Sequence, residues 1–430
     1  MSNRNRLLVV QYAFPPLGGA GVQRVLKFVK YLAVLGWEVK VLTTASLDYT
    51  VHDHSLTDEV PAEVEVVRAR EWPIPPLRDA LLNPLHRLKV PGLLRYVGWP
   101  DERAGWLPFA VREGLRIADR FQPDVVLSSA SPVSAHLVGR VLSRARGIPW
   151  VADFRDPWTQ VEDSDDPRLL AAANRRLERS IVTHAHYVTV ADDPIQLVGL
   201  PTDDDRRVVI YNGVDEADLD DDHRPAMPGA SQFTLTHVGS LYGRRDAAPV
   251  FDAITRLVNA GRVTASDIEV RLVGNVWLEG RSTSARPYDV TTIGYVPHQD
   301  SIREMHSAGA LLFYQPDGYP TSSGKIFEYL VAGRPILCVA NRSNLAARLV
   351  EEFDAGVVVD PGDPLAIEEA ISLLHRRWTE HALSISPTVR DRALARFSRR
   401  ALTHKLHEVL TDAVAGGASP RQSRSSIKTD

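Results

Sequence analysis

The feature that most restricts the possible folds is a strand–loop–helix–strand pattern near the N-terminus. Residues 7–12 (LLVVQY) are a short apolar run, and the glycine-containing stretch FPPLGGAGVQR follows it. Apolar residues then recur at helical spacing until Gly36, after which EVKVLTT supplies the next strand. Strands that are joined through a helix lie parallel in one sheet, so this segment predicts a parallel sheet with helices packed on it.

The same pattern recurs along the chain. Residues 125–154 contain a strand, a helix at about 133–146 and a second strand, and a further series begins at FTLTHVGSLY. Between these series, an acidic stretch with Asp220–Asp222 and two prolines has the composition of a linker. A chain of 430 residues is long enough for two domains with full cores. The sequence therefore predicts a two-domain α/β protein that ends in a helix near 387–413 and a disordered tail at 416–430.

Composition excludes several classes of protein. Lys and Arg total 50 against 54 Asp and Glu, a net charge of −4 that gives no basis for nucleic-acid binding. The single cysteine, Cys338, excludes a disulfide framework, and no apolar run reaches the ~18 residues of a membrane span. The acidic clusters at 163–166, 203–205 and 220–222 have no His or Cys at ligand spacing and are interpreted as solvated turns rather than metal sites. We expect a cytoplasmic protein with no metal.

The glycine loop after the first strand has two interpretations. Gly18, Gly19 and Gly21 resemble a dinucleotide fingerprint, but Arg24 replaces the third glycine and the second strand ends in Thr43–Thr44 without the acid that binds ribose. NAD is therefore not expected. The loop is either a tight turn or a segment whose backbone approaches a ligand closely.

A second candidate site follows the strand that ends near residue 154. Asp153, Arg155, Asp156 and Trp158 cluster there, and ligands of parallel sheets bind beyond the carboxyl ends of the strands. These residues either contact a substrate or form a structural Asp–Arg pair that caps the loop.

The stretch SSGKIFEYLVAGRPIL carries the third candidate site. Its pattern is helical after Gly324, and Gly333 with Pro335 ends the helix. Lys325 and Glu328 lie on a face different from the apolar one, so they form either an ordinary ion pair or a phosphate-binding site at the helix N-terminus. Upstream, GSLYGRR places Gly239 after a strand and Arg244 and Arg245 in the following loop, either to bind a diphosphate or as exposed charges.

The stretch at 70–110 is irregular, rich in proline, and contains Trp72, Trp99 and Trp106. Within it, residues 78–97 interleave leucines with basic residues. Such a segment either packs on its domain or makes peripheral contact with an anionic membrane.

Taken together, five segments resemble the GT-B glycosyltransferases, specifically the large retaining group called family 4. They occur in the family's order and span nearly the whole chain: FPPLGGAGVQR, DFRDPW, YNGVD, GSLYGRRD and SSGKIFEYLVAGRPIL. The resemblance implies two Rossmann-like domains with parallel sheets facing an interdomain cleft. Residues 1–205 would bind the acceptor, residues 206–386 would bind the nucleotide-sugar, and the last helix would cross back onto the first domain.

The resemblance also implies roles for residues. Arg244 or Arg245 would bind the donor diphosphate together with Lys325, Glu328 would bind the ribose hydroxyls, and Gly239, Ser323 and Gly324 would lie at the nucleotide. Asp153, Arg155 and Asp156 would be the catalytic residues that position acceptor or sugar, with the acceptor near Gly18, Gly19 and Gly21. A UDP- or GDP-sugar is the expected co-substrate, without a further cofactor. The acceptor would be a saccharide, a lipid-linked molecule or a small molecule, in polysaccharide or natural-product biosynthesis.

Two departures from the family pattern leave alternatives open. Pro320 stands where the family commonly has a glutamate that contacts the donor sugar, so Asp317 or the backbone at 321–323 would have to replace it. Phe154–Arg155–Asp156 stands where many members have a histidine. A sugar-nucleotide epimerase on the same fold and a catalytically silent GT-B partner protein therefore remain alternatives to a transferase.

Overall fold

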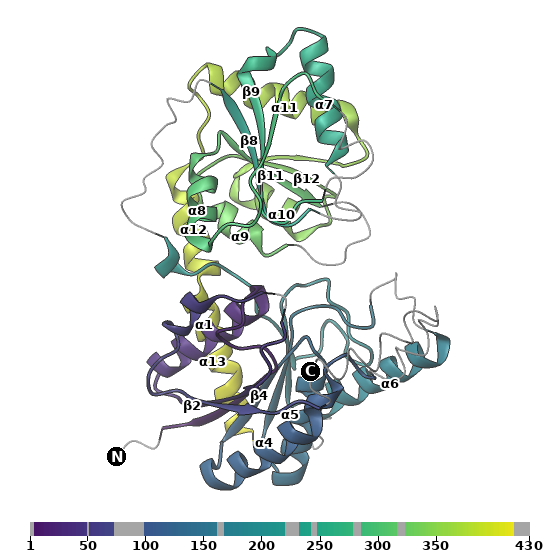
Figure 1. The fold of residues 1–430 in the computed structure, drawn as a ribbon, viewed down its shortest axis with the longest axis vertical. Coiled ribbons are helices and arrows are strands. Elements are labelled where there is room, and N and C mark those ends of the chain that lie inside the picture. The colour runs from purple at the N-terminus through teal and green to yellow at the C-terminus, as the bar shows by residue number, and fades with distance from the viewer. Residues whose placement is uncertain are drawn as a thin grey trace, which may run out of the picture. The chain divides into compact units, whose positions relative to one another are not determined.

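The computed structural model describes residues 4–49, 51–72, 99–160, 167–219, 232–241, 247–277, 285–315 and 323–416. Arg244, Arg245, Asp317, Pro320 and residues 78–97 lie outside this part of the chain. The structure divides into two compact units (Figure 1). One contains the chain up to Tyr211 together with the residues from Leu402 onward, and the other contains Asn212–Ala401.

The first unit is built on a seven-stranded sheet with the order β3-β2-β1-β4-β5-β6-β7, in which every pair of neighbours is parallel. The central strands are fully buried, as expected where helices cover both faces of a parallel sheet. The order reverses direction between β1 and β4. The strands are β1 (Arg6–Gln11), β2 (Glu38–Thr44), β3 (Glu65–Ala69), β4 (Val125–Ala130), β5 (Trp150–Phe154), β6 (Tyr187–Val190) and β7 (Arg207–Val209).

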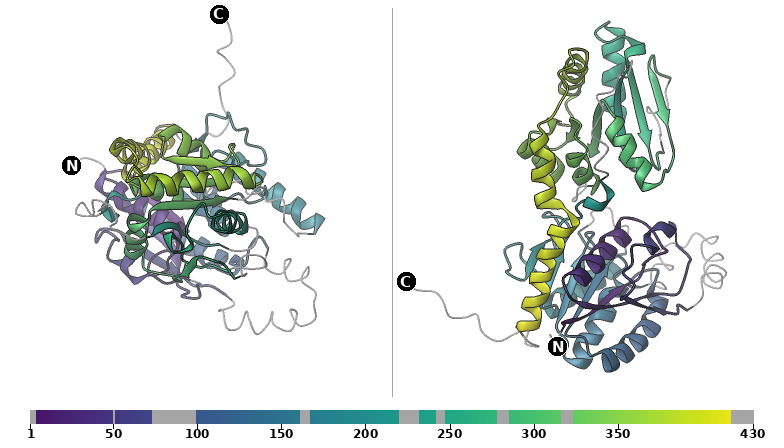
Figure 2. Two further views of the ribbon diagram at one scale, coloured as in Figure 1. Left: turned by 90° about the horizontal axis from the view of Figure 1, so that it is seen from above. Right: turned by 90° about the vertical axis from the view of Figure 1, so that its left-hand side faces the viewer.

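Helices cover both faces of this sheet (Figures 1 and 2). Helix α1 (Ala20–Val34) lies on one face, whereas α4 (Leu107–Phe121), α5 (Ser134–Arg146) and α6 (Arg168–His184) follow one another on the other. The C-terminal helix α13 (Arg399–Ala415) adds Leu402, Leu406 and Leu410 to the buried core of the first unit. This unit also contains two short 3-10 turns, His54–Thr57 between β2 and β3 and Ala104–Trp106 directly before α4.

The second unit repeats the plan with a six-stranded parallel sheet of order β10-β9-β8-β11-β12-β13. Here the order reverses between β8 and β11. The strands are β8 (Phe233–Val238), β9 (Ile268–Val273), β10 (Asp289–Thr292), β11 (Ala310–Gln315), β12 (Ile336–Ala340) and β13 (Gly356–Val359). The helices are α7 (Ala248–Asn259), α8 (His298–Ser307), α9 (Lys325–Val331), α10 (Leu345–Phe353), α11 (Pro364–Thr379) and α12 (Pro387–Phe397), with 3-10 turns at 216–218 and 265–267. The predicted fold class, an α/β protein with two Rossmann-like parallel sheets, is confirmed.

The C-terminal helix differs from the prediction of one helix over 387–413. Ser398 separates α12 from α13 and has extended backbone angles (φ −63°, ψ 145°). The backbone on either side of Ser398 pairs with Val214. The N–H of Val214 donates to the carbonyl of Phe397 (3.0 Å), and the N–H of Arg399 donates to the carbonyl of Val214 (2.7 Å). The local side-chain pattern cannot show this interruption because the partner strand segment lies far earlier in the chain.

Candidate functional site

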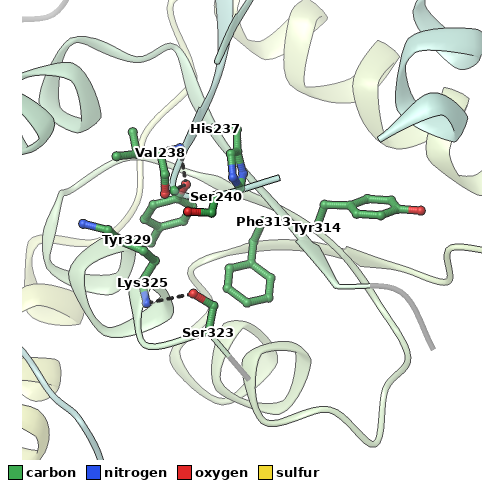
Figure 3. Close-up of a pocket in the computed structure, with 9 residues that line it drawn as sticks. His237, Val238, Ser240, Phe313, Tyr314, Ser323, Lys325 and Tyr329 are labelled. Atoms are coloured by element: carbon green, nitrogen blue, oxygen red, sulfur yellow. Dashed lines mark hydrogen bonds between the residues drawn. The ribbon is translucent and has the colours of Figure 1, made fainter. Parts of the chain in front are cut away.

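A cavity lies at the carboxyl edge of the second sheet, where the strand order reverses between β8 and β11 (Figure 3). In open α/β sheets this reversal leaves a crevice in which ligands bind. The lining residues come from the end of β8, the end of β11 and the start of α9: His237, Val238, Gly239, Ser240, Phe313, Tyr314, Ser323, Lys325 and Tyr329. Three of them, Gly239, Ser323 and Lys325, were predicted from the sequence as donor-binding residues, and the structure brings these three together.

Gly239 keeps the wall of the cavity free of a side chain. Its φ of 149° lies in a region that residues with a Cβ rarely adopt. A Cβ at this position would meet His237 Nε2 at 3.3 Å and Lys325 Cγ at 3.9 Å. The Gly239 N–H donates to the carbonyl of Val273 (2.8 Å), which extends the β8–β9 pairing beyond the strands. Backbone is therefore exposed toward the cavity directly beside the Lys325 side chain.

Two side chains that sequence reasoning missed fix the shape of the cavity. The buried Tyr329 hydroxyl accepts the N–H of Val238 (2.7 Å), which joins α9 to the end of β8. Burial raises the pKa of Tyr329, so the phenol is neutral at physiological pH. His237 Nδ1 lies 3.0 Å from the carbonyl oxygen of Leu312 and donates to it, which turns the Nε2 edge of the ring toward Gly239. The available sequence signal was a histidine near the end of a strand that alternates apolar residues with threonine.

Lys325 and Glu328 form an ion pair with Nζ and Oε2 2.6 Å apart, so the ion-pair interpretation of the sequence describes a contact that exists. Both side chains remain partly exposed, at 26% and 19%. Partly exposed ion pairs of this kind contribute at most ~1 kcal/mol to the free energy of folding. Helix α9 has only seven residues, so the charge available to a ligand comes from the lysine side chain more than from the helix dipole. The pair therefore costs little to separate when an anion approaches Lys325.

The carboxyl edge of the first sheet holds the other predicted residues. Asp153 is buried and accepts two bonds from the guanidinium of Arg24, at 2.8 and 3.1 Å. Its oxygens also accept the hydroxyls of Ser129 (2.7 Å) and Thr189 (2.6 Å). Burial alone would raise the pKa of Asp153, but the Arg24 guanidinium and the hydroxyls of Thr189 and Ser129 together outweigh it, and the pKa is lowered overall.

Arg24 also donates to the carbonyl of Tyr211 (2.8 Å), so the arginine that replaces the third fingerprint glycine joins α1, β5 and the end of the first unit. With four bonds to its two oxygens, the carboxylate of Asp153 is saturated. This geometry supports a structural role for Asp153. The catalytic role predicted from the sequence stays a prediction for this residue.

Arg155 lies directly against the glycine loop. A Cβ on Gly21 would be 0.8 Å from Arg155 Nη1, so the guanidinium occupies the space that a side chain at position 21 would need. Arg155 Nε donates to Asp156 (3.0 Å), and the exposed fractions of the two side chains are 16% and 54%. Gly19, with a φ of 103°, is the N-cap residue before α1, and the N–H of Gly18 donates to the carbonyl of Val51 (2.9 Å). The structure thus brings Arg155, which follows β5, against the glycine loop, which follows β1, and Asp156 is joined to the loop through its bond with Arg155.

Glu178, which sequence reasoning also missed, holds the loop that carries Arg155. This buried carboxylate on α6 accepts the Thr159 hydroxyl (2.7 Å) and the Val198 N–H (2.8 Å), so it joins the loops after β5 and β6. Burial raises the pKa of Glu178, and its hydrogen bonds only partly offset that effect.

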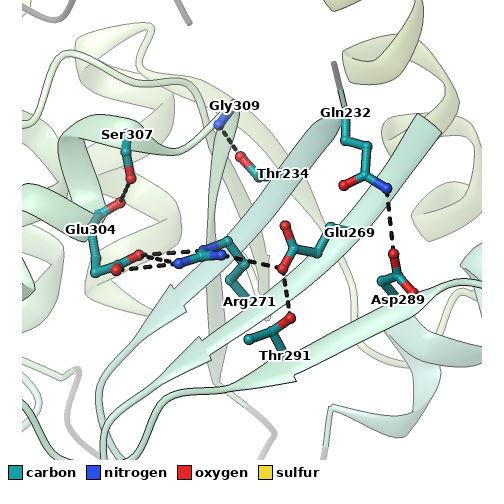
Figure 4. Close-up of polar contacts among 9 residues, drawn as sticks. All are labelled: Gln232, Thr234, Glu269, Arg271, Asp289, Thr291, Glu304, Ser307 and Gly309. Carbon is teal, nitrogen blue, oxygen red and sulfur yellow. Dashed lines mark hydrogen bonds and ion pairs between the residues drawn. The ribbon is translucent and has the colours of Figure 1, made fainter. Parts of the chain in front are cut away.

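A further polar cluster lies on the edge strand β10 of the second sheet, on its neighbour β9 and on α8 (Figure 4). Arg271 on β9 binds both carboxylate oxygens of Glu304 on α8, at 3.0 and 3.2 Å, and Glu269 accepts a bond from Thr291 on β10 (2.7 Å). Burial alone would lower the pKa of Arg271, but Glu304 and Glu269 together raise it overall. Because its charges pair with one another, we interpret this cluster as a structural link between β9, β10 and α8.

Within the described ranges, no three His, Cys, Asp or Glu side chains gather in a way that could hold a metal ion. No described helix is both long enough and apolar enough to span a membrane.

The fold is that of an α/β protein of two Rossmann-like units with a cavity at the strand-order reversal of the second sheet, and comparison with known proteins gives its class. Residues 18–213 match the family model of the glycosyl transferase 4-like domain, and residues 232–377 match that of glycosyl transferases group 1. These two matches together cover most of the chain. The protein therefore belongs to the GT-B glycosyltransferases, and the predicted family is confirmed.

Solved structures agree with this assignment. HepE from Anabaena, in complex with UDP and glucose, is 16% identical with a TM-score of 0.60, and the match covers 95% of this chain and 100% of that chain. Sucrose-phosphate synthase from Thermosynechococcus elongatus is 14% identical with a TM-score of 0.65, covering 96% and 100%. At these identities the likeness shows the fold. No curated protein matches the chain by sequence.

Proposed function

We propose that this glycosyltransferase moves a sugar from a nucleotide-sugar to an acceptor hydroxyl, with retention of the anomeric configuration and without a metal ion. The observation that carries the proposal is the cavity at the β8–β11 reversal, where Lys325 lies beside bare backbone at Gly239. A diphosphate fits such a site because it needs a cation and close approach to backbone. The similar HepE has been solved with UDP-glucose, which supports a UDP-sugar ahead of a GDP-sugar here.

On this proposal, Lys325 exchanges its ion pair with Glu328 for the donor diphosphate. Glu328 is then available to accept hydrogen bonds from the ribose hydroxyls, and Ser323 and Gly324 line the approach to the phosphates. The bond between the anomeric carbon and the diphosphate oxygen breaks, the acceptor oxygen bonds to the same face of the sugar, and its proton passes to the leaving diphosphate. Lys325 stabilises the negative charge that develops on the leaving group.

The first unit supplies the acceptor side. Arg155 lies against Gly21 of the glycine loop, and it is paired with the more exposed Asp156. We assign them to positioning the acceptor or the transferred sugar. Asp153 acts through Arg24 by holding β5 and α1 together.

The test is a transfer assay with the purified full chain, UDP-glucose and a panel of saccharide, lipid-linked and small-molecule acceptors, with and without EDTA. We expect product in both conditions, with the donor's anomeric configuration by NMR, and at least tenfold less product with Lys325→Gln. Arg376→Gln, which changes an exposed arginine on α11, is the charge-matched control. Epimerised nucleotide-sugar without acceptor would indicate an epimerase. Nucleotide binding without turnover of any donor would indicate a silent partner.

A further inference from the structure

His237 borders the space that Gly239 leaves open in the cavity at the β8–β11 reversal. A Cβ at Gly239 would meet His237 Nε2 at 3.3 Å and Lys325 Cγ at 3.9 Å. A ligand oxygen in that space would therefore lie within hydrogen-bonding reach of the imidazole and beside the lysine side chain. Both His237 and Lys325 line the cavity (Figure 3). The ring thus faces the place at which the proposed function puts the donor diphosphate.

The hydrogen bond on the other side of the ring fixes which nitrogen faces the cavity. His237 Nδ1 donates to the carbonyl of Leu312 on β11 (3.0 Å), because a carbonyl oxygen can only accept. Nε2 is then an acceptor when the ring is neutral and a donor when the ring is protonated. A phosphate oxygen is itself an acceptor, so it can bond to Nε2 only after the ring has taken up a proton.

Without a ligand, the surroundings of His237 favour a neutral ring. The residue is only 8% exposed, and burial disfavours a charged imidazole. Lys325 is the one permanent cation among the described residues that line the cavity, and a positive neighbour acts in the same direction. The ion pair of Lys325 with Glu328 (2.6 Å) reduces this repulsion.

A bound diphosphate reverses the balance of charge. The diphosphate of a nucleotide-sugar carries two negative charges, whereas Lys325 supplies one positive charge among the described lining residues. The other titratable groups that line the cavity are the phenols of Tyr314 and Tyr329, and burial raises the pKa of Tyr329. Leu272, the neighbour of the histidine on β9, and the first turn of α7, Ala248–Phe251, bring only apolar side chains. The imidazole is therefore the described group that can supply a second positive charge.

We propose that His237 is a second cationic contact of the donor diphosphate. As the donor binds, the ring takes up one proton from solvent, and Nε2–H donates to a phosphate oxygen. The proton stays on the ring during sugar transfer, where it stabilises the charge on the leaving group, and returns to solvent when the nucleoside diphosphate leaves. The proposal rests on the donor site of the proposed function and adds that donor binding is linked to pH.

The experiment is isothermal titration of nucleotide-sugars into the full chain from pH 6 to pH 8.5. UDP-, GDP-, dTDP- and ADP-glucose are the probes, because both of their phosphates are esterified and neither titrates in this range. We expect the Kd of the preferred donor to rise with pH in the native chain. Titrations in buffers of different ionisation enthalpy should show uptake of up to about one proton per donor bound near neutral pH.

The variant that tests the assignment is His237→Asn, because its amide N–H can still donate to Leu312 while the group that faces the cavity is gone. At pH 6 its Kd should be roughly 10- to 150-fold higher than that of the native chain, and it should not change with pH. The matched control is His404→Asn, which changes an exposed histidine of α13 and should keep the native pH profile. Lys325→Gln should bind the donor more weakly at every pH.

These measurements separate the role of His237 from the donor site itself. A native Kd that is constant or falls as the pH rises, or a His237→Asn variant that keeps the native pH profile, would overturn the proposal. If Lys325→Gln still weakened binding in that case, the donor site would stand and only the role of His237 would fall. Absence of binding by all four nucleotide-sugars would refute the donor site and this proposal with it. Proton uptake by the native chain tests the proposal even where His237→Asn does not fold.

Discussion

The buried pair of Arg24 and Asp153 joins α1 to β5 in the first unit. Replacing Arg24 by Met keeps most of the side-chain volume but leaves the carboxylate of Asp153 buried with only Ser129 and Thr189 as donors. Breaking one partner of a buried pair costs about 3–5 kcal/mol. For a unit of this size, each kcal/mol lowers the melting temperature by about 2–4 °C, so we expect a loss of roughly 6–20 °C.

The assay is thermal unfolding followed by circular dichroism, with Arg116→Met as the control. Arg116 pairs with Glu113 on the surface of α4, at 50% and 31% exposure, and its removal should change the melting temperature by no more than about 2 °C. Combining Arg24→Met with Asp153→Leu should restore much of the loss, because the uncompensated charge is gone. If Arg24→Met were as mild as Arg116→Met, the assignment of Asp153 to a structural role would be wrong.

Three further predictions concern the sites and their supports. Gly21→Ala should lower kcat/KM at least tenfold by displacing Arg155, and in an Arg155→Ala background the same change should have little further effect; additive losses would contradict the coupling. Because burial raises the pKa of Glu178 above its ordinary value, the native chain loses stability as the pH rises through the raised pKa. The free energy of unfolding of Glu178→Gln, measured in urea, should therefore improve relative to that of the native chain from pH 4.5 toward pH 8. A difference that stays constant with pH would refute this. Tyr329→Phe leaves the buried N–H of Val238 without its acceptor, and urea unfolding should show a loss of about 1–3 kcal/mol, whereas no loss would mean that the hydroxyl does not join α9 to β8.

The elements that local pattern determines were predicted well. The strand of residues 125–129 is β4, the helix that begins after Gly324 is α9, and Gly333 ends it with a φ of 70°. In each case the information is local: a continuous apolar run for a buried strand, and a glycine for the left-handed end of a helix. Family resemblance then supplied the arrangement of two such sheets.

The supports of the candidate site were not predictable in this way. The bond from Tyr329 to Val238 joins α9 to the end of β8, and Glu178 joins two loops from the far side of α6. Both depend on which segments the fold brings together, and neither residue stands out in its own stretch of sequence. Gly21 was noted in the sequence as part of a loop that could approach a ligand. The structure gives a different reason for a glycine there, because Arg155 occupies the space that a side chain at position 21 would need.

Asp153 was singled out in the sequence, but its partner was not. Its place after a buried strand is where substrate contacts are found in such sheets, and the sequence offered a structural pair as the alternative. The partner is Arg24, which the sequence noted only as the residue that breaks the glycine fingerprint. A pair between residues so far apart in the chain becomes visible only when β1 and β5 take their places around β4.

The central claim is that the cavity beside Lys325 binds the diphosphate of a nucleotide-sugar. The most direct measurement is isothermal titration of UDP, GDP, dTDP and ADP into the native chain, Lys325→Gln and the control Arg376→Gln. A hydrogen bond to a charged group contributes about 1.5–3 kcal/mol, so we predict one preferred nucleotide whose Kd rises roughly 10- to 150-fold in Lys325→Gln and is unchanged in the control. Binding of that nucleotide with the same Kd in all three proteins would contradict the claim.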